Sequence, residues 1–174
     1  AMASSIADEE ADSLAGVEAS VYSEDDISWT LDDDGTLTVS GKGSMGWWGI
    51  DVDKEKVKKI VVEEGITNVN FKGFSNLETV TLPDSLTRIG DNAFYDCISL
   101  KDIKIPDNVT EIEDHVFSSC NSLESITLPE SITSIGSSAF AGCTSLESII
   151  LPESVTSIGS LAFGNCVNLE AVEM

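Results

Sequence analysis

The sequence has few positively charged residues and few aromatic residues. Its 174 residues include 9 Lys and Arg against 31 Asp and Glu, which gives a formal net charge of −22 at pH 7. This balance argues against nucleic acid as a partner and against electrostatic docking on anionic lipid, because both ligands are negatively charged. Aromatic residues make up 6% and hydrophobic residues 41%, so the chain can build a core, but a mainly aliphatic one.

Long apolar runs and catalytic motifs are also missing. No stretch approaches the roughly 18 consecutive apolar residues that a membrane-spanning helix needs. The chain contains no G-x-S-x-G, H-E-x-x-H or phosphate-loop motif. We therefore expect no enzyme, no catalytic residues and no bound cofactor.

The charges that are present are unevenly distributed. Residues 1–41 hold 11 acidic residues and no Lys or Arg, and residues 105–174 hold 10 acidic residues and no Lys or Arg. All nine basic residues lie between Lys42 and Lys104. The charge of the folded chain's surface should therefore differ between the region that contains residues 42–104 and the regions before and after it.

Four residue types recur at one spacing, which predicts a repeat architecture. All the prolines and all the cysteines of the chain obey this spacing of 23 residues. The recurring residues are Pro83, Pro106, Pro129 and Pro152; Cys97, Cys120, Cys143 and Cys166; Phe94, Phe117, Phe140 and Phe163; and Leu77, Leu100, Leu123, Leu146 and Leu169.

One unit, residues 123–145, shows what each repeat should form. Ile126 and Leu128 alternate with polar residues, which predicts a strand with one buried face. Pro129 should end that strand, because proline cannot donate to a ladder. A second short apolar segment follows, and Ser137 could then cap a helical turn. A single unit cannot bury its apolar face, whereas stacked units can, so the pattern predicts a solenoid.

The repeats divide the chain into three predicted regions. Residues 57–174 should form the solenoid, with a shorter first repeat over residues 57–76 that has Glu63 in the proline position. Residues 25–56 should form a β-hairpin cap around a turn at Asp34-Gly35, with Trp47 and Trp48 covering apolar surface. Residues 1–24 are acidic, rich in Ala and Ser and without a clear period, so we expect them to be mostly disordered or loosely attached.

The repeat consensus, L-x-x-[IV]-x-[IL]-P-x-x-[ILV]-T-x-I-G-x-x-A-F-x-x-C, resembles the BspA-type leucine-rich repeats of bacterial surface proteins. The resemblance covers about residues 57–174, and the segment 29–43 resembles the segment that often precedes such repeats. It implies a right-handed solenoid of parallel strands with a short helical or irregular convex side. Glu113 in a glycine position and Val116 in an alanine position depart from the pattern and should affect local turns only.

The cysteines suggest three kinds of site. One cysteine per repeat at core spacing favours a ladder of buried free thiols. A disulfide is the alternative, since neighbouring repeats would place Cα atoms about 5 Å apart, but parallel side chains would not converge. A zinc site usually has paired short spacings such as C-x-x-C, which are absent, so we expect no metal.

Two other motifs have simpler interpretations. Asp32-Asp33-Asp34-Gly35 suggests calcium, but the alternate ligands and distal glutamate of an EF-hand loop are missing. A hairpin turn with solvated acids is favoured, and a weak surface calcium site is the alternative. His115 has no partner that the sequence can assign, so we expect a surface histidine.

The residues that the repeat does not dictate are the candidate ligand-binding positions. They alternate with core residues on the strands and should form an exposed sheet face, basic at its start, hydroxyl-rich in its middle and acidic at its end. These positions are Lys58, Lys59, Glu78, Thr79, Thr81, Lys101, Asp102, Lys104, Glu124, Ser125, Thr127, Glu147, Ser148 and Ile150.

The resemblance implies a secreted or cell-surface module that binds a protein of a host or neighbouring cell, without membrane span. No signal peptide is visible, so this location assumes that one has been removed. The alternatives are a structural spacer or self-assembly module of a longer surface protein, a carbohydrate-binding module and a cytoplasmic scaffold. Leu169, Val172 and Met174 lie in a terminal strand without a cap, which predicts self-association, for example a homodimer, through the last repeat.

Overall fold

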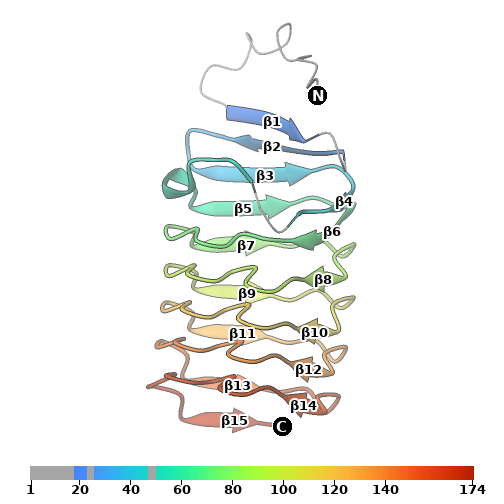
Figure 1. Cartoon of the computed structure of the whole chain (residues 1–174). Helices are drawn as coiled ribbons and strands as arrows, with labels where there is room; N and C mark the ends of the chain where they lie inside the picture. The colour runs from blue at the N-terminus through green and yellow to red at the C-terminus, as the bar shows by residue number, and fades with distance from the viewer. Residues whose placement is uncertain (1–17, 23–25, 47–49) are drawn as a thin grey trace, which may run out of the picture.

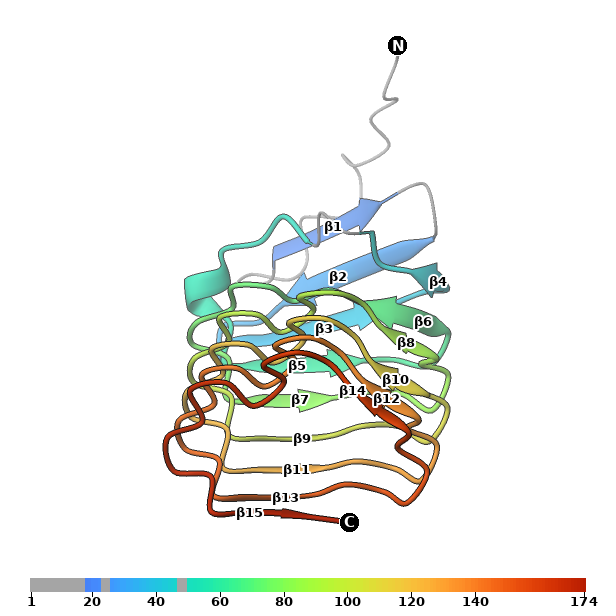
Figure 2. The same ribbon diagram turned by 60° about the horizontal axis from the view of Figure 1, so that its bottom comes forward.

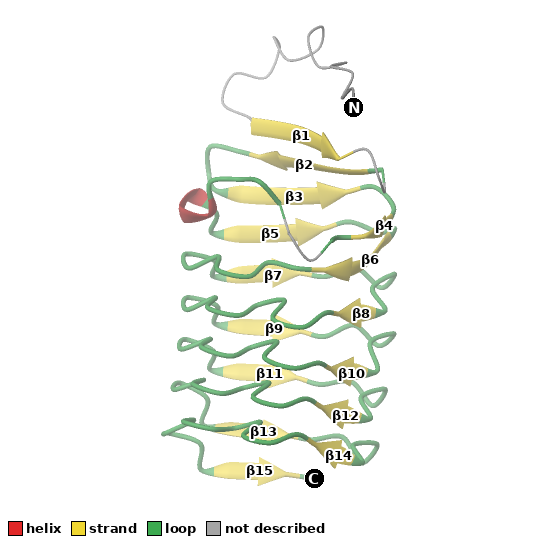
Figure 3. Ribbon diagram, in the orientation of Figure 1, coloured by secondary structure: helices red, strands yellow, loops and turns green. Residues whose placement is uncertain are grey.

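The computed structural model describes residues 18–22, 26–46 and 50–174, which form an elongated stack of coils (Figure 1). The coils consist of short strands joined by turns, and the described part of the chain has a single 3-10 helix, η1 (Lys54–Lys56) (Figure 3). Two rows of strands run along the stack (Figure 2).

The first row contains β1 (Glu18–Tyr22), β2 (Ile27–Leu31), β3 (Thr36–Ser40), β5 (Lys59–Val62), β7 (Thr79–Thr81), β9 (Asp102–Lys104), β11 (Ser125–Thr127), β13 (Ser148–Ile150) and β15 (Ala171–Glu173). The second row contains β4 (Gly43–Ser44), β6 (Ile66–Val69), β8 (Arg88–Ile89), β10 (Glu111–Ile112), β12 (Ser134–Ile135) and β14 (Ser157–Ile158).

Equivalent residues of successive coils lie beside one another, as the regular repeat spacing predicts. β9 and β11 pair in parallel, with Ile103 beside Ile126 and Lys104 beside Thr127. β10, β12 and β14 pair in parallel in the second row. The predicted solenoid of parallel strands is confirmed.

A column of phenylalanine rings fills the centre of the stack. The rings of Phe94, Phe117, Phe140 and Phe163 stack with centroids 5.4–5.5 Å apart and interplanar angles of 5–16°. Leu77, Leu100, Leu123 and Leu146 are fully buried around this column. The core is therefore continuous along the stack, because each coil buries the apolar face of the next one.

The expected helical turn at Ser137 is absent; residues 137–142 form successive turns instead. The main reason is that their backbone groups bond to neighbouring coils. The N–H of Phe117 donates to the carbonyl of Ala139, and the N–H of Phe140 donates to the carbonyl of Ala162, each at 2.7 Å. Ser138 also has a φ of 54°, which a helix would not allow.

A left-handed backbone conformation recurs at two positions of each coil, and at the first of these positions none of the four residues is glycine. Asn92, His115, Ser138 and Leu161 occupy the same position in successive repeats and have φ angles between 54° and 61°. Asn tolerates this region, whereas a leucine there is strained. His115 is exposed, as predicted. It occupies the position of the repeat at which the backbone turns through the left-handed region.

The N-terminal strands extend the first row beyond the repeats. β2 and β3 form the predicted antiparallel hairpin, with Trp29 beside Val39, and β3 pairs in parallel with β5. Residues 18–22 form β1, antiparallel to β2, within the region 1–24 that the sequence predicts to be mostly disordered or loosely attached. The rest of that prediction, and the expected role of Trp47 and Trp48, lie outside the described residues.

Candidate functional site

The candidate site is the outward surface of β5, β7, β9, β11 and β13 and of the residue before each strand, here called the sheet face. All fourteen sequence-predicted positions on this face are exposed. The residues that alternate with them point into the stack, as Ile60, Ile103 and Ile149 show by their burial. The repeat therefore fixes the inward side chains and leaves the outward ones free to vary.

Charges on the sheet face differ between its two halves. Lys58, Lys59 and Lys104 are exposed on the first half. Lys101 lies there too, but its Nζ is 3.0 Å from Oε2 of Glu78, so this lysine is partly neutralised across the strands. The basic end is thus weaker than the sequence suggests. The second half, over β11 and β13, carries only acidic charge because residues 105–174 contain no Lys or Arg.

A row of carboxylates at the end of the strands was missed by the sequence reasoning. Each repeat proline is followed by an exposed acidic residue, and the signal was a Pro-[Asp/Glu] pair at the repeat spacing. These residues are Asp84, Asp107, Glu130 and Glu153. Glu64 holds the equivalent place in the first coil, where it accepts hydrogen bonds from the backbone N–H groups of Asp84 and Ser85 at 2.9 and 3.0 Å. These bonds lower the pKa of Glu64.

A groove of about 430 Å³ crosses the second half of the sheet face near the ends of β11 and β13. Its floor includes the hydroxyl residues Thr127 and Ser148 and the aliphatic Ile150, which is 66% exposed. Glu130 and Glu153 also line it. The groove thus joins positions of the predicted sheet face to the carboxylate row, and it gives the candidate site a concave part.

The second row of strands carries a different charged cluster. Arg88 on β8 donates through Nη2 to Oε2 of Glu113 at 2.8 Å, and its Nε also bonds this carboxylate. Burial, followed by the nearby Glu113 charge, raises the pKa of Asp91. Glu113, which replaces a repeat glycine, thus ties two coils together through Arg88. We assign this cluster a structural role.

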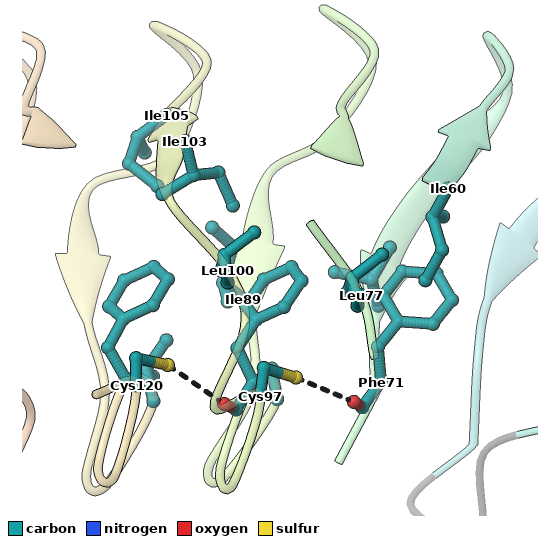
Figure 4. Close-up of a cluster of buried hydrophobic side chains, with 14 of the residues drawn as sticks. Ile60, Phe71, Leu77, Ile89, Cys97, Leu100, Ile103, Ile105 and Cys120 are labelled. Atoms are coloured by element: carbon teal, nitrogen blue, oxygen red, sulfur yellow. Dashed lines mark hydrogen bonds between the residues drawn. The ribbon is translucent and has the colours of Figure 1, made fainter. Parts of the chain in front are cut away.

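The thiols form the predicted ladder inside the stack (Figure 4). Cys97, Cys120 and Cys143 are buried and free, and Cys166 is half-buried and free. Each Sγ donates to the carbonyl of a phenylalanine of the preceding coil, at 3.0–3.3 Å. Burial raises the pKa of the Cys97 and Cys143 thiols from 9.0 to about 12. These groups are therefore unreactive thiols at neutral pH.

The acidic turn between β2 and β3 has a structural explanation. Oδ1 of Asp32 accepts the backbone N–H groups of Asp34 at 3.0 Å and Thr36 at 2.8 Å, and Gly35 has a φ of 82°. The turn is thus closed by its own aspartate, as such residues commonly do. Within the described ranges, no group of three or more His, Cys, Asp or Glu side chains is arranged to hold a metal ion. The same part of the chain has no helix long and apolar enough to cross a membrane.

The last coil exposes positions that are core positions elsewhere. Val172 on β15 is 47% exposed, whereas its neighbour Ile149 on β13 is 2% exposed. Ile158 on β14 and Met174 are exposed as well, and Leu169 is half-buried. Of the candidate self-association residues, Val172 and Met174 thus belong to an exposed apolar surface, whereas Leu169 is half-buried.

The fold and its sheet face define a class, the leucine-rich repeat proteins. The sequence model of the "BspA type Leucine rich repeat region" matches residues 56–174 in six copies. The chain belongs to the BspA-type leucine-rich repeat family, as its repeat consensus predicts. No curated protein matches the chain significantly.

Solved bacterial structures share the fold. A leucine-rich repeat protein of T. pallidum is 32% identical with a TM-score of 0.65, over 83% of this chain and 66% of that one. A leucine-rich repeat protein of Bacteroides ovatus is 30% identical with a TM-score of 0.67, over 85% of this chain and 39% of that one. A "leucine rich cell surface protein" of Faecalibacterium prausnitzii is 24% identical with a TM-score of 0.55, over 88% of this chain and 54% of that one. The chain thus spans only part of the length of each of these relatives.

Proposed function

We propose that the chain is a non-enzymatic binding module of a secreted or cell-surface protein, and that its sheet face recognises a protein of a host or neighbouring cell. One observation carries the proposal: the fourteen candidate positions are all exposed on one face of the stack. A rigid face loses little conformational entropy on binding. Repeat proteins commonly use such extended faces to bind partners.

The proposed location is supported by two further observations. The F. prausnitzii relative is described as a cell surface protein. The thiols would otherwise be a liability outside the cell, where disulfides form readily. Their burial, and the raised pKa of Cys97 and Cys143, would protect them from oxidation. Free cysteines are thus compatible with an extracellular site.

The test is a pull-down from matrix and cell-surface extracts with three immobilised proteins. The first is the unaltered chain, and the second replaces Lys101, Thr127, Ser148 and Ile150, which span both halves of the sheet face, by alanine. The third is a control that replaces four exposed residues on or beside the second row of strands: Thr110, Glu111, Ser157 and Ser160. The proposal expects a partner that the control retains and the sheet-face variant loses. A partner lost only by the control would contradict it.

A second candidate function is self-assembly within a longer surface protein through Leu169, Val172 and Met174. Val172 and Ile158 occupy core positions there yet are exposed. Association between two such ends would bring acidic coils together, so it should strengthen as salt screens the repulsion. Light scattering tests this: the mass should rise with concentration and salt, and Val172→Ser should suppress the rise. A mass independent of both would contradict self-assembly.

A carbohydrate-binding function is less favoured. Sugar-binding surfaces commonly expose aromatic rings, and none of the fourteen sheet-face positions is aromatic. Trp29, the one described tryptophan, is buried at 5% exposure in the hairpin.

A further inference from the structure

Ile150 is out of place in the row of side chains to which it belongs. The equivalent outward positions on β7, β9 and β11 are polar and exposed: Thr81, Lys104 and Thr127. Val61 on β5 is also aliphatic, but it is half-buried. Ile150 is 66% exposed, and its neighbour Ile149 already supplies the inward side chain of β13, so the core does not need this group. Ile150 lines a groove together with Leu128 and Met174, and a contiguous apolar patch of this kind indicates a contact with a partner.

The groove around Ile150 is lined by residues on and after β11 and β13 and by Met174 of the last coil. It occupies about 430 Å³ between the ends of β11 and β13, and Thr127 and Ser148 add hydroxyl groups to its floor. Leu128, Leu151 and Pro152 continue its apolar lining past the ends of β11 and β13. A space of this size admits one aliphatic side chain of a partner together with its adjoining backbone.

Carboxylates flank the groove on both sides. Glu130 and Glu153 follow the two strands and line it, while Glu124 and Glu147 immediately precede the same strands. All four are exposed, and none forms an ion pair with another described residue. Equivalent residues of neighbouring coils lie side by side, so like charges repel one another across the strands. Basic groups of a partner would relieve that repulsion.

We infer that the groove binds an extended segment of the partner protein in which an aliphatic side chain is flanked by lysines or arginines. The aliphatic side chain packs on Ile150, and the flanking cations lie against the two pairs of carboxylates. This inference rests on the proposed function and adds the chemistry of the ligand. It places the main contact on the acidic half of the sheet face rather than at Lys101 and Lys104.

The test uses synthetic peptides and fluorescence anisotropy. The probe is a short labelled peptide that alternates lysine and serine around a central leucine. One comparison peptide has glutamate in place of lysine, and another has serine in place of leucine. The lysine–leucine peptide should bind at least about tenfold more tightly than either, because it alone supplies both the apolar and the cationic contacts.

Variants separate this groove from general attraction to an acidic protein. Ile150→Thr introduces a residue that Thr81 and Thr127 already show to be compatible with the fold, and it should weaken binding about tenfold. The pair Glu130→Gln and Glu153→Gln should weaken it as much. The matched control is the pair Asp33→Asn and Asp34→Asn, which removes the same charge at the distant hairpin turn and should change affinity less than about twofold.

Three results would overturn the inference. They are an unchanged affinity in Ile150→Thr, an equal loss in the hairpin control, and no saturable binding up to roughly 1 mM peptide. None of them bears on the proposed function itself. If the pull-down still yields a partner that the sheet-face variant loses, the binding module stands and only the ligand chemistry is wrong.

Discussion

The column of stacked phenylalanines gives a quantitative test of how the coils hold together. The ring of Phe117 is fully buried between two others, with centroids 5.5 Å from Phe94 and 5.4 Å from Phe140. Phe163 is half-buried in the last coil and stacks on Phe140 alone among the described rings. The two sites therefore offer the same substitution, Phe→Leu, with two ring contacts in one case and one in the other.

The expected magnitudes differ by the number of ring contacts. Each stacked pair is worth about 0.5–1.5 kcal/mol beyond buried area, and a shorter side chain leaves a cavity worth about 0.5 kcal/mol in the core. Phe117→Leu should thus lower the free energy of unfolding by about 1.5–3.5 kcal/mol. Phe163→Leu should lower it by about 0.5–1.5 kcal/mol, because it loses one pair and its site is open to solvent.

The assay is urea unfolding followed by far-ultraviolet circular dichroism, with both variants measured beside the unaltered chain. The slope of free energy against urea must be compared as well, since fraying of the last coil would lower it. Equal losses for the two variants would refute the reasoning, because the number of ring contacts would then not set the stability. A larger loss for Phe163→Leu would refute it more strongly.

Three further predictions concern the backbone, the thiols and the surface charge. Leu161→Asn should raise the free energy of unfolding, measured by thermal unfolding, by about 0.5–1 kcal/mol. Leu161 adopts a left-handed conformation that asparagine tolerates better, as Asn92 does at the equivalent position. Because the pKa of Cys97 is raised from 9.0 to about 12 by burial, its contribution to stability is full below pH 9 and is lost as the pH rises toward 12. Cys97→Ala should flatten that part of the pH–stability curve. Arg88→Gln should lower the free energy of unfolding by about 0.5–1 kcal/mol, and adding Glu113→Gln should restore part of it, as chemical denaturation would show.

Much of the fold could be predicted because the repeat displays the same constraint several times. Because proline, cysteine and phenylalanine each recur at one spacing, the sequence predicts a stack of equivalent coils in which each residue type forms a column. The inward positions followed from alternation with polar residues, as Ile103 and Ile149 show. The exposed sheet face followed from the same alternation, so the whole set of candidate positions could be named in advance.

The features that were missed depend on contacts between coils that a single repeat does not reveal. Ser137 has the residue type of a helix cap, but backbone bonds to neighbouring coils outweigh that local preference. β1 lies in an acidic segment without a repeat period, and its pairing with β2 supplies the order. The partnership of Lys101 with Glu78 requires knowing which rotamers meet across two strands. The groove at Ile150 is lined by residues of three coils, so no linear motif marks it.

The most direct test of the central claim, that the sheet face is the binding surface, is photo-crosslinking on intact cells. One variant carries a benzophenone side chain in place of Ser148 on the sheet face. A second variant carries it in place of Thr133, which lies beside β12 in the second row of strands. The account predicts a covalent adduct with a cell-surface protein from Ser148 and none from Thr133. An adduct from Thr133 and none from Ser148 would contradict it.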